Sequence, residues 1–229
     1  MRLSVWEDQG KSIRTNSIYL ASIAELQRAV AKKVQTQYTL EKEATSVCGV
    51  DVAYRKNVSF CSAVLMNKNN MEVKESINAT LNVKHPYVPS YFMIRECDPI
   101  MNIMKLLKTD FDVLLVEGHG VLHPRRCGLA SYVGVMANKS TIGVAKTLLC
   151  GSIRADNFVE LDGVVSGYKM IKQGMKPVYV SVGHKIDLAN AITIAEQLVK
   201  REERIPEPLR LADINSKKLA NMSQLQDKY

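Results

Sequence analysis

The densest group of chemically active side chains lies in residues 112–134, which read DVLLVEGHGVLHPRRCGLASYVG. An apolar run delivers the carboxylate of Glu117 into a glycine-rich turn. The ordinary interpretation is a strand end and a solvated loop, but a charge buried there is costly without a metal or cationic partner. The turn adds two glycines for close backbone approach and side-chain donors for phosphate oxygens: Gly118, Gly120, His119, His123, Arg125 and Arg126. This density favours a chemical role.

A second carboxylate, Asp51, interrupts the apolar run VCGVDVAYR. If this strand lies beside the strand that ends at Glu117, the two carboxylates are close enough to share a divalent ion. Like charges at that distance require a cation or a shared proton. Oxygen ligands favour Mg²⁺ or Mn²⁺ over zinc. The alternative for Asp51, taken alone, is a strand aspartate that faces solvent.

Three further residues are weaker candidates when each is considered separately. Glu96 lies in the helix-like segment IRECD, where a solvated ion pair with Arg95 is the ordinary interpretation. His184 follows the strand-like segment PVYVSV, a place where a histidine more often caps or packs than catalyses. Lys146 ends the segment TIGVAK, and a lysine there commonly extends its ammonium group to solvent. Whether these residues belong to a functional site depends on what surrounds them in the fold.

A rigid aromatic side chain and the overall charge point to a polyanionic partner. Tyr87 is held between Pro86 and Pro89, an arrangement suited to stacking on a base, although an ordinary loop tyrosine is equally common. The formal net charge is +8, which by itself is a weak sign of nucleic-acid binding. Acidic residues at strand ends, basic residues and a clamped aromatic together indicate metal-dependent phosphodiester chemistry on nucleic acid.

Composition predicts one soluble domain over residues 1–229, with a polar, loosely held tail after Pro206 and Pro208, from about residue 214. Five cysteines with no CxxC pair argue against a disulfide framework or a zinc cluster. They favour a reducing compartment. Charged residues follow the first few positions, so no signal peptide is expected, and no apolar run is long enough to span a bilayer. A cytoplasmic monomer is the resulting expectation.

Hydrophobic periodicity predicts an antiparallel meander followed by alternating strands and helices. Helices are expected at about 20–39, 91–107 (kinked or split by Pro99), 128–137 and 188–201. Strands are expected at 47–55, 58–66, 71–83, 113–117, 141–146, 164–170 and 177–182. This order predicts an α/β domain with a mixed sheet of five or more strands flanked by helices.

Several long motifs in order resemble the endonuclease V family, nucleases that act at deaminated adenine. The resemblance covers roughly Val47 to Asp213. It rests on GVDVAY around Asp51, PYVPSYFMIRE from Pro86, VEGHGVLHPRRCGLASYVG, TIGVAK, VGHK at His184 and PEPLRLAD from Pro206. The resemblance implies an RNase H-like fold with the first and fourth strands side by side. It also implies Mg²⁺-dependent hydrolysis of the second phosphodiester bond 3′ to inosine, which leaves 3′-hydroxyl and 5′-phosphate ends.

The resemblance also implies roles for particular residues. Asp51, Glu96 and Glu117 would form the metal site. His184 would lie near the attacking water or leaving group, and Lys146 near the phosphate. Mg²⁺ would be the cofactor, with Mn²⁺ as a substitute.

The resemblance implies that a further group of residues recognises the base. The loop from Pro86 to Pro89 would separate the strands, with Tyr87 filling the space left by the extruded base. Hypoxanthine would be held by residues that act partly through their backbone groups: Phe92, Gly118, Gly120, Gly128 and Leu129. Arg125 and Arg126 would add positive charge for the phosphate backbone.

Two departures from the family pattern bear on activity. Glu117 stands where the family usually has Asp, and Tyr132 stands where His is common. A longer carboxylate disturbs the octahedral geometry that Mg²⁺ demands, which predicts a preference for Mn²⁺. The alternatives left open are an inosine-specific endoribonuclease and a nucleic-acid-binding relative with weakened catalysis. The HPRR form after GHG favours DNA as the substrate.

Overall fold

The computed structural model describes residues 9–37, 40, 43–83, 85 and 88–226. One mixed sheet organises this part of the chain, with strand order β3-β2-β1-β4-β5-β9-β8-β7-β6. Its strands are β1 (Ser46–Arg55), β2 (Val58–Asn67), β3 (Val73–Asn82), β4 (Val113–Glu117), β5 (Ser140–Ala145), β6 (Ser152–Ile153), β7 (Phe158–Leu161), β8 (Val164–Met170) and β9 (Val178–His184). Strands β1, β4 and β5 are parallel neighbours, and the other pairs are antiparallel. The predicted mixed sheet is confirmed.

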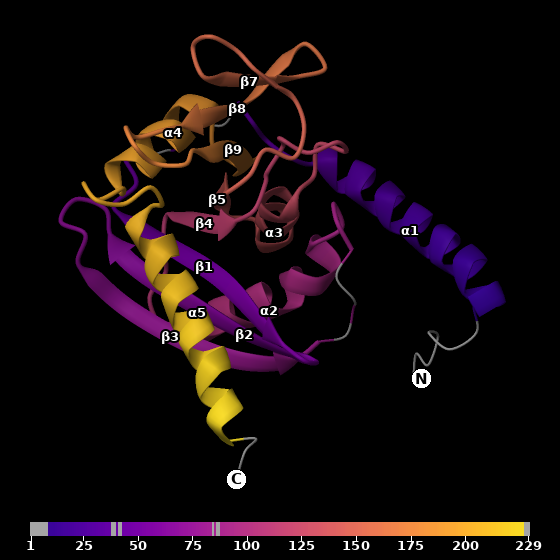
Figure 1. The fold of residues 1–229 in the computed structure, drawn as a ribbon. Coiled ribbons are helices and arrows are strands. Elements are labelled where there is room, and N and C mark those ends of the chain that lie inside the picture. Colours follow the sequence, from indigo (N-terminus) through magenta and orange to yellow (C-terminus); the bar gives the residue numbers. More distant parts are fainter. Residues whose placement is uncertain (1–8, 38–39, 41–42, 84, 86–87, 227–229) are drawn as a thin grey trace.

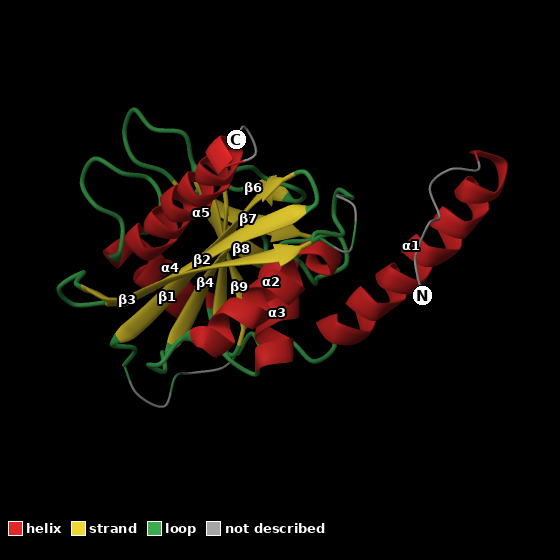
Figure 2. Ribbon diagram, turned by 90° about the horizontal axis from the view of Figure 1, so that it is seen from below, coloured by secondary structure: helices red, strands yellow, loops and turns green. Residues whose placement is uncertain are grey.

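Helices cover both faces of this sheet (Figures 1 and 2). They are α1 (Gln9–Ala31), α2 (Met93–Leu106), α3 (Leu129–Ala137), α4 (Leu188–Gln197) and α5 (Glu207–Gln226). Figure 2 shows α5 on one face of the sheet and α2 with α3 on the other. In Figure 1, α1 extends away from the body of the molecule, and its last turns lie near α3. Among the described residues no helix has the length and apolarity needed to cross a membrane.

The strand alternation divides the core into two clusters. Val47 and Leu115 pack with α4 and the start of α5, whereas Cys48, Val50 and Leu114 pack with α2 and α3. Successive strand side chains point to opposite faces. Asp51 and Glu117 therefore point to the face that α5 covers.

Two element predictions were wrong. The segment after Pro206 is no loose tail, because it forms α5 and packs on β1 and β2. Its buried positions recur at helical spacing: Leu209, Ala212, Ser216 and Ala220. The short strands β6 and β7 were not predicted.

Pro99 does not split α2, which is one helix. Proline lacks the N–H that would bond to the carbonyl of Arg95 four residues earlier. The hydroxyl of Tyr54 donates to that carbonyl instead, at 3.4 Å. The other differences are shifts in bounds: α1 spans 9–31 and not 20–39, α4 ends at Gln197, and strands such as β3 and β9 shift by one or two residues. All five cysteines are free, as expected.

Candidate active site

Two of the predicted carboxylates meet at the carboxyl ends of the parallel strands. Strands β1 and β4 pair up to Val50 and Val116, so Asp51 and Glu117 occupy the next positions on neighbouring strands. The predicted adjacency of these strands is confirmed. Ligands of α/β proteins commonly bind at this edge of a parallel sheet.

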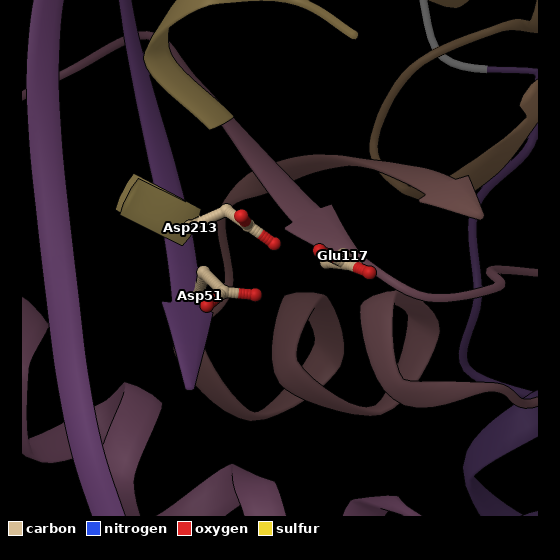
Figure 3. A group of neighbouring side chains, drawn as sticks. All are labelled: Asp51, Glu117 and Asp213. Carbon is tan, nitrogen blue, oxygen red and sulfur yellow. The ribbon is translucent and has the colours of Figure 1, made fainter. Parts of the chain in front are cut away.

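A third carboxylate, Asp213, comes from α5 and was not predicted as a site residue. The three side chains point toward one another in Figure 3. Each offers an oxygen, and these oxygens lie within 4.8 Å of one another. Asp213 belonged to the matched segment PEPLRLAD, so the signal was present, but the segment was interpreted as the start of a tail.

Cationic and hydroxyl groups hold the three carboxylates together. The Lys146 ammonium lies 2.7 Å from Glu117 and 2.8 Å from Asp213. Lys217 contacts Asp213 from the next turn of α5 at 2.7 Å. The hydroxyl of Ser216 donates to Asp51 at 2.5 Å. These contacts offset part of the repulsion among the like charges.

The environment raises the pKa of two glutamates. Burial raises the pKa of Glu117 to about 7 against the opposing effect of Lys146, and the neighbouring Asp51 raises it further. Burial, then the charges of Asp51 and Glu117, raise the pKa of Glu96 to about 8. Burial also acts to raise the pKa of Asp213, but the hydrogen bonds from Lys146 and Lys217 outweigh it and lower the pKa. Carboxyl groups crowded in this way gain stability from a bound cation.

The acidic group fits a hard divalent cation. Its donors are all oxygens, which suits Mg²⁺ or Mn²⁺. The Lys146 ammonium lies between Glu117 and Asp213 and shows that positive charge is accommodated there. Glu96 lines the same cavity from α2, but it is not one of the three converging carboxylates.

A cavity of about 370 Å³ opens beside the carboxylates. One wall comes from the segment before α2 and the other from the loop before α3. The predicted base-binding residues among its lining are Pro89, Phe92, Gly118, His123, Gly128 and Leu129. Gly118 has φ +148°, and a Cβ on Gly128 would lie 2.2 Å from the His119 carbonyl oxygen, so both positions require glycine.

Other predicted residues lie elsewhere. Gly120 packs under β9, where a Cβ would lie 1.9 Å from the Val182 carbonyl oxygen. The Arg126 guanidinium donates to Ser166 and to the carbonyl of Leu161. Neither Gly120 nor Arg126 is among the cavity-lining residues. Pro86 and Tyr87, the predicted wedge, lie outside the described residues.

His184 is not brought together with the carboxylates. It pairs with Thr141 near the start of β5, whereas Glu117 pairs with Val144. Three residues of strand correspond to roughly 10 Å. The His184 ring nitrogen Nδ1 accepts the backbone N–H of Gln35 at 3.3 Å, and the residue is buried. This environment is that of a packing residue.

Comparison with known proteins points to one family. The family model for Endonuclease V matches residues 28–214. An Endonuclease V of Thermofilum pendens is 39% identical over 193 residues, which is 82% of this chain and 83% of that protein.

Solved structures agree as well. Ciona intestinalis Endonuclease V, in complex with a 24mer DNA containing an inosine followed by a ribo-adenosine, has a TM-score of 0.81 at 28% identity, covering 89% of this chain and 98% of that one. Bacillus subtilis Endonuclease V has a TM-score of 0.81 at 28% identity, covering 88% and 92%. The predicted RNase H-like α/β fold is confirmed. With a matching fold, a matching family model and an acidic site at the expected strand ends, the chain belongs to the Endonuclease V family of nucleases.

Proposed function

We propose that this protein is a metal-dependent endonuclease that cleaves DNA at deoxyinosine, in DNA repair. The observation that carries the proposal is the convergence of Asp51, Glu117 and Asp213 beside a cavity that is walled by the predicted base-binding residues. The family resemblance supplies the cleavage position, the second phosphodiester bond on the 3′ side of inosine. It also supplies the products, a 3′-hydroxyl and a 5′-phosphate.

Asp51, Glu117 and Asp213 would hold the metal, with Mg²⁺ or Mn²⁺ favoured by their oxygen donors. A bound divalent ion supplies Lewis-acid polarisation of a phosphoryl oxygen and stabilises the charge that develops on it. Ser216 orients Asp51 through its hydrogen bond. Lys146 keeps Glu117 and Asp213 together, and its ammonium group would supply positive charge to the substrate phosphate.

Glu96 adds a proton-holding group to the same cavity. Its pKa of about 8 means that it retains its proton at neutral pH in the metal-free protein. A cation bound nearby would lower that pKa and release the proton. Glu96 is therefore proposed to serve the site as a carboxylate once the metal is bound.

Base recognition is assigned to the cavity. Phe92 offers an aromatic face and Leu129 an apolar surface, while the glycines at 118 and 128 expose backbone groups. Extruding a nucleotide from a duplex costs a few kcal/mol, and less for a weakly paired base. Contacts within the cavity would offset that cost.

Inosine-containing RNA is the second candidate substrate. The Ciona protein was crystallised with a strand in which a ribo-adenosine follows the inosine. That observation makes a ribonucleotide beside the inosine a relevant test, whereas the HPRR segment favours DNA.

Cleavage of labelled oligonucleotides tests the proposal. Four strands of one sequence would be compared: DNA with deoxyinosine, DNA with adenine, the deoxyinosine strand with a following ribo-adenosine, and RNA with inosine. Each is incubated with Mg²⁺, Mn²⁺ or a chelator. The expected result is metal-dependent cleavage of inosine DNA at the second bond 3′ to the inosine, with little cleavage of the adenine control. Equal cleavage of inosine and adenine strands would contradict it, and cleavage confined to RNA would select the second candidate.

A further inference from the structure

Three distant segments meet at one backbone carbonyl on the cavity wall. The Ser90 carbonyl oxygen accepts from the Gln27 amide at 3.2 Å, from Nε2 of His123 at 3.0 Å and from the Arg125 guanidinium at 2.8 Å. Gln27 belongs to α1, Ser90 to the segment before α2, and His123 and Arg125 to the loop before α3. We refer to these four residues as the Ser90 clamp.

The side-chain amide of Gln27 acts as both a donor and an acceptor within the clamp. Its Nε2 also donates to the carbonyl of Cys127 at 2.9 Å, and its Oε1 accepts from Nε of Arg125 at 2.5 Å. The residue is only 1% exposed, on the face of α1 that also buries Ile23 and Val30. A buried polar side chain with partners on two loops fixes those loops relative to each other.

The guanidinium group of Arg125 makes contacts along its edge and on its face. Besides Gln27 and the Ser90 carbonyl, it donates to the Ser90 hydroxyl at 2.9 Å and lies 4.2 Å from the centre of the Tyr91 ring. A planar fork that bonds in two directions and stacks on a ring cannot be replaced by lysine. These contacts differ from the phosphate-binding role that the sequence predicted for Arg125.

His123 completes the arrangement as a neutral ring. Its Nδ1 accepts the backbone N–H of Arg125 at 3.1 Å, which leaves the proton on Nε2 for the Ser90 carbonyl. Ser90 itself has φ +62°, a left-handed conformation that is unfavourable for a non-glycine residue. Such a conformation persists where its surroundings hold it in place, as three donors do here.

The clamp joins the two walls of the cavity. Pro89 and Phe92, on either side of Ser90 and Tyr91, form part of one wall, and Gly128 and Leu129 form part of the other. Farther along α1, the Tyr19 hydroxyl lies 3.2 Å from Nδ1 of His85. Helix α1 thus contacts the segment that leads into α2 at two places.

We propose that Gln27 and Arg125 are positioning residues that set the spacing of the two cavity walls and thereby the discrimination between inosine and other bases. The proposal rests on the proposed function, which assigns base recognition to this cavity. It predicts that loosening the clamp affects recognition more than the chemical step, because the carboxylates are held by β1, β4 and α5, whereas the hydrogen bonds of the clamp join α1 to the segments before α2 and α3.

The test compares Gln27→Leu, Gln27→Glu and Arg125→Lys with the wild-type protein. Gln27→Leu removes every polar contact at similar size. Gln27→Glu keeps an acceptor for Arg125 but places a carboxylate against the carbonyl oxygens of Ser90 and Cys127, to which the wild-type amide donates. Gln37→Leu, at an exposed position, is the matched control. KM and kcat are measured on inosine and adenine oligonucleotides, and amide hydrogen exchange is measured over residues 88–92 without nucleic acid.

The expected result is a KM for inosine DNA raised about tenfold in each clamp variant, with kcat changed less than about twofold. Exchange over residues 88–92 should rise in parallel, and the control should match wild type. Gln27→Glu and Arg125→Lys keep the test decisive if Gln27→Leu fails to fold.

Unchanged amide hydrogen exchange over residues 88–92 in the clamp variants would overturn the proposal, because it would show that the clamp does not hold this segment in place. A loss that is equal on both oligonucleotides and grows with salt, or a near-normal Arg125→Lys, would overturn it in favour of a phosphate contact. The exchange measurement does not depend on cleavage, so it judges the clamp even if wild-type protein fails to select inosine, an outcome that would refute the proposed function instead.

Discussion

The side chain of Glu117 lies beside one cation, Lys146, and two acids, Asp51 and Asp213. Its carboxylate lies 2.7 Å from the Lys146 ammonium and is close enough to Asp51 for the two groups to affect each other's protonation. Its pKa of about 7 means that a metal ion competes with a proton for this group near neutral pH. The length of the side chain therefore bears on metal geometry.

Glu117→Asp is expected to raise Mg²⁺-supported cleavage and to narrow the advantage of Mn²⁺. Removing one methylene withdraws the carboxylate from the site and relaxes its packing around an ion that demands octahedral geometry. Cleavage of inosine DNA over a range of each metal checks this. Asp51→Glu, which lengthens the neighbouring acid, serves as the opposite change and should lower cleavage. Identical metal profiles for Glu117→Asp and wild type would show that position 117 does not set metal geometry.

Glu96 makes the metal-free fold sensitive to pH. Burial holds its folded pKa at about 8, above the ordinary value of 4.5. Between these two values the unfolded chain has released a proton that the folded chain retains. Folding therefore becomes less favourable as the pH rises from about 4.5 to about 8.

Glu96→Gln is expected to increase the free energy of unfolding at pH 8 by about 1–3 kcal/mol in the presence of chelator, with a much smaller effect at pH 5. Urea denaturation at the two pH values measures it. Glu75→Gln is a control of opposite sign, because hydrogen bonds from the Lys108 backbone lower the pKa of Glu75 and its charge favours the fold. A Glu96→Gln protein that is less stable than wild type at pH 8 would contradict the account.

At the scale of the elements, α5 positions Asp213 by close packing on β1. The ideal Cβ of an alanine at Gly49 would lie 2.3 Å from the Pro208 backbone, so only glycine lets the start of α5 approach the strand. From this contact α5 extends along β1, and Ser216 reaches Asp51. The position of the third carboxylate thus depends on a residue with no side chain.

Gly49→Ala is expected to lower stability by about 1–3 kcal/mol, because the added methyl group forces α5 away from β1. Cleavage should fall further than stability explains, since Asp213 moves with the helix. Thermal denaturation and kcat under conditions where the variant is folded separate the two effects. Gly174→Ala is the matched control: φ +77° strains it, yet no atom lies within 4 Å of its Cβ. Equal kcat for Gly49→Ala and wild type would disprove the proposed link.

The elements that were predicted well have large apolar residues at regular spacing. Strands β1, β2 and β4 are rich in Val and Leu, and their bounds were close to the structure. Helix α5 was missed because its buried stripe is partly made of small residues, Ala212, Ser216 and Ala220, after two prolines. Pro208 in its first turn is in fact typical of a helix start.

At the scale of the whole molecule, the site combines residues that pattern reasoning can and cannot locate. Asp51 was predictable as the one carboxylate within an apolar strand, and Glu117 as the carboxylate that ends one. Asp213 was not, because its role depends on how α5 folds back over β1. Arg125 looked like a phosphate ligand by residue type, whereas its contacts are with α1 and Ser90, which are distant in sequence. The local spacing of residues does not predict such long-range contacts.

The central claim is that carboxylates from β1, β4 and α5 form one divalent-metal site that cleavage requires. Calorimetric titration of Mn²⁺ into the wild-type protein and into Asp51→Asn, Glu117→Gln and Asp213→Asn tests it most directly, with cleavage of inosine DNA measured on the same samples. Asp162→Asn, an exposed residue on the β7–β8 turn, is the control. The account predicts that each of the three variants weakens Mn²⁺ binding at least about tenfold, close to 1.4 kcal/mol, and loses cleavage, while the control does neither. Wild-type Mn²⁺ affinity in any one of the three would remove that carboxylate from the site, and wild-type affinity in all three would contradict the claim.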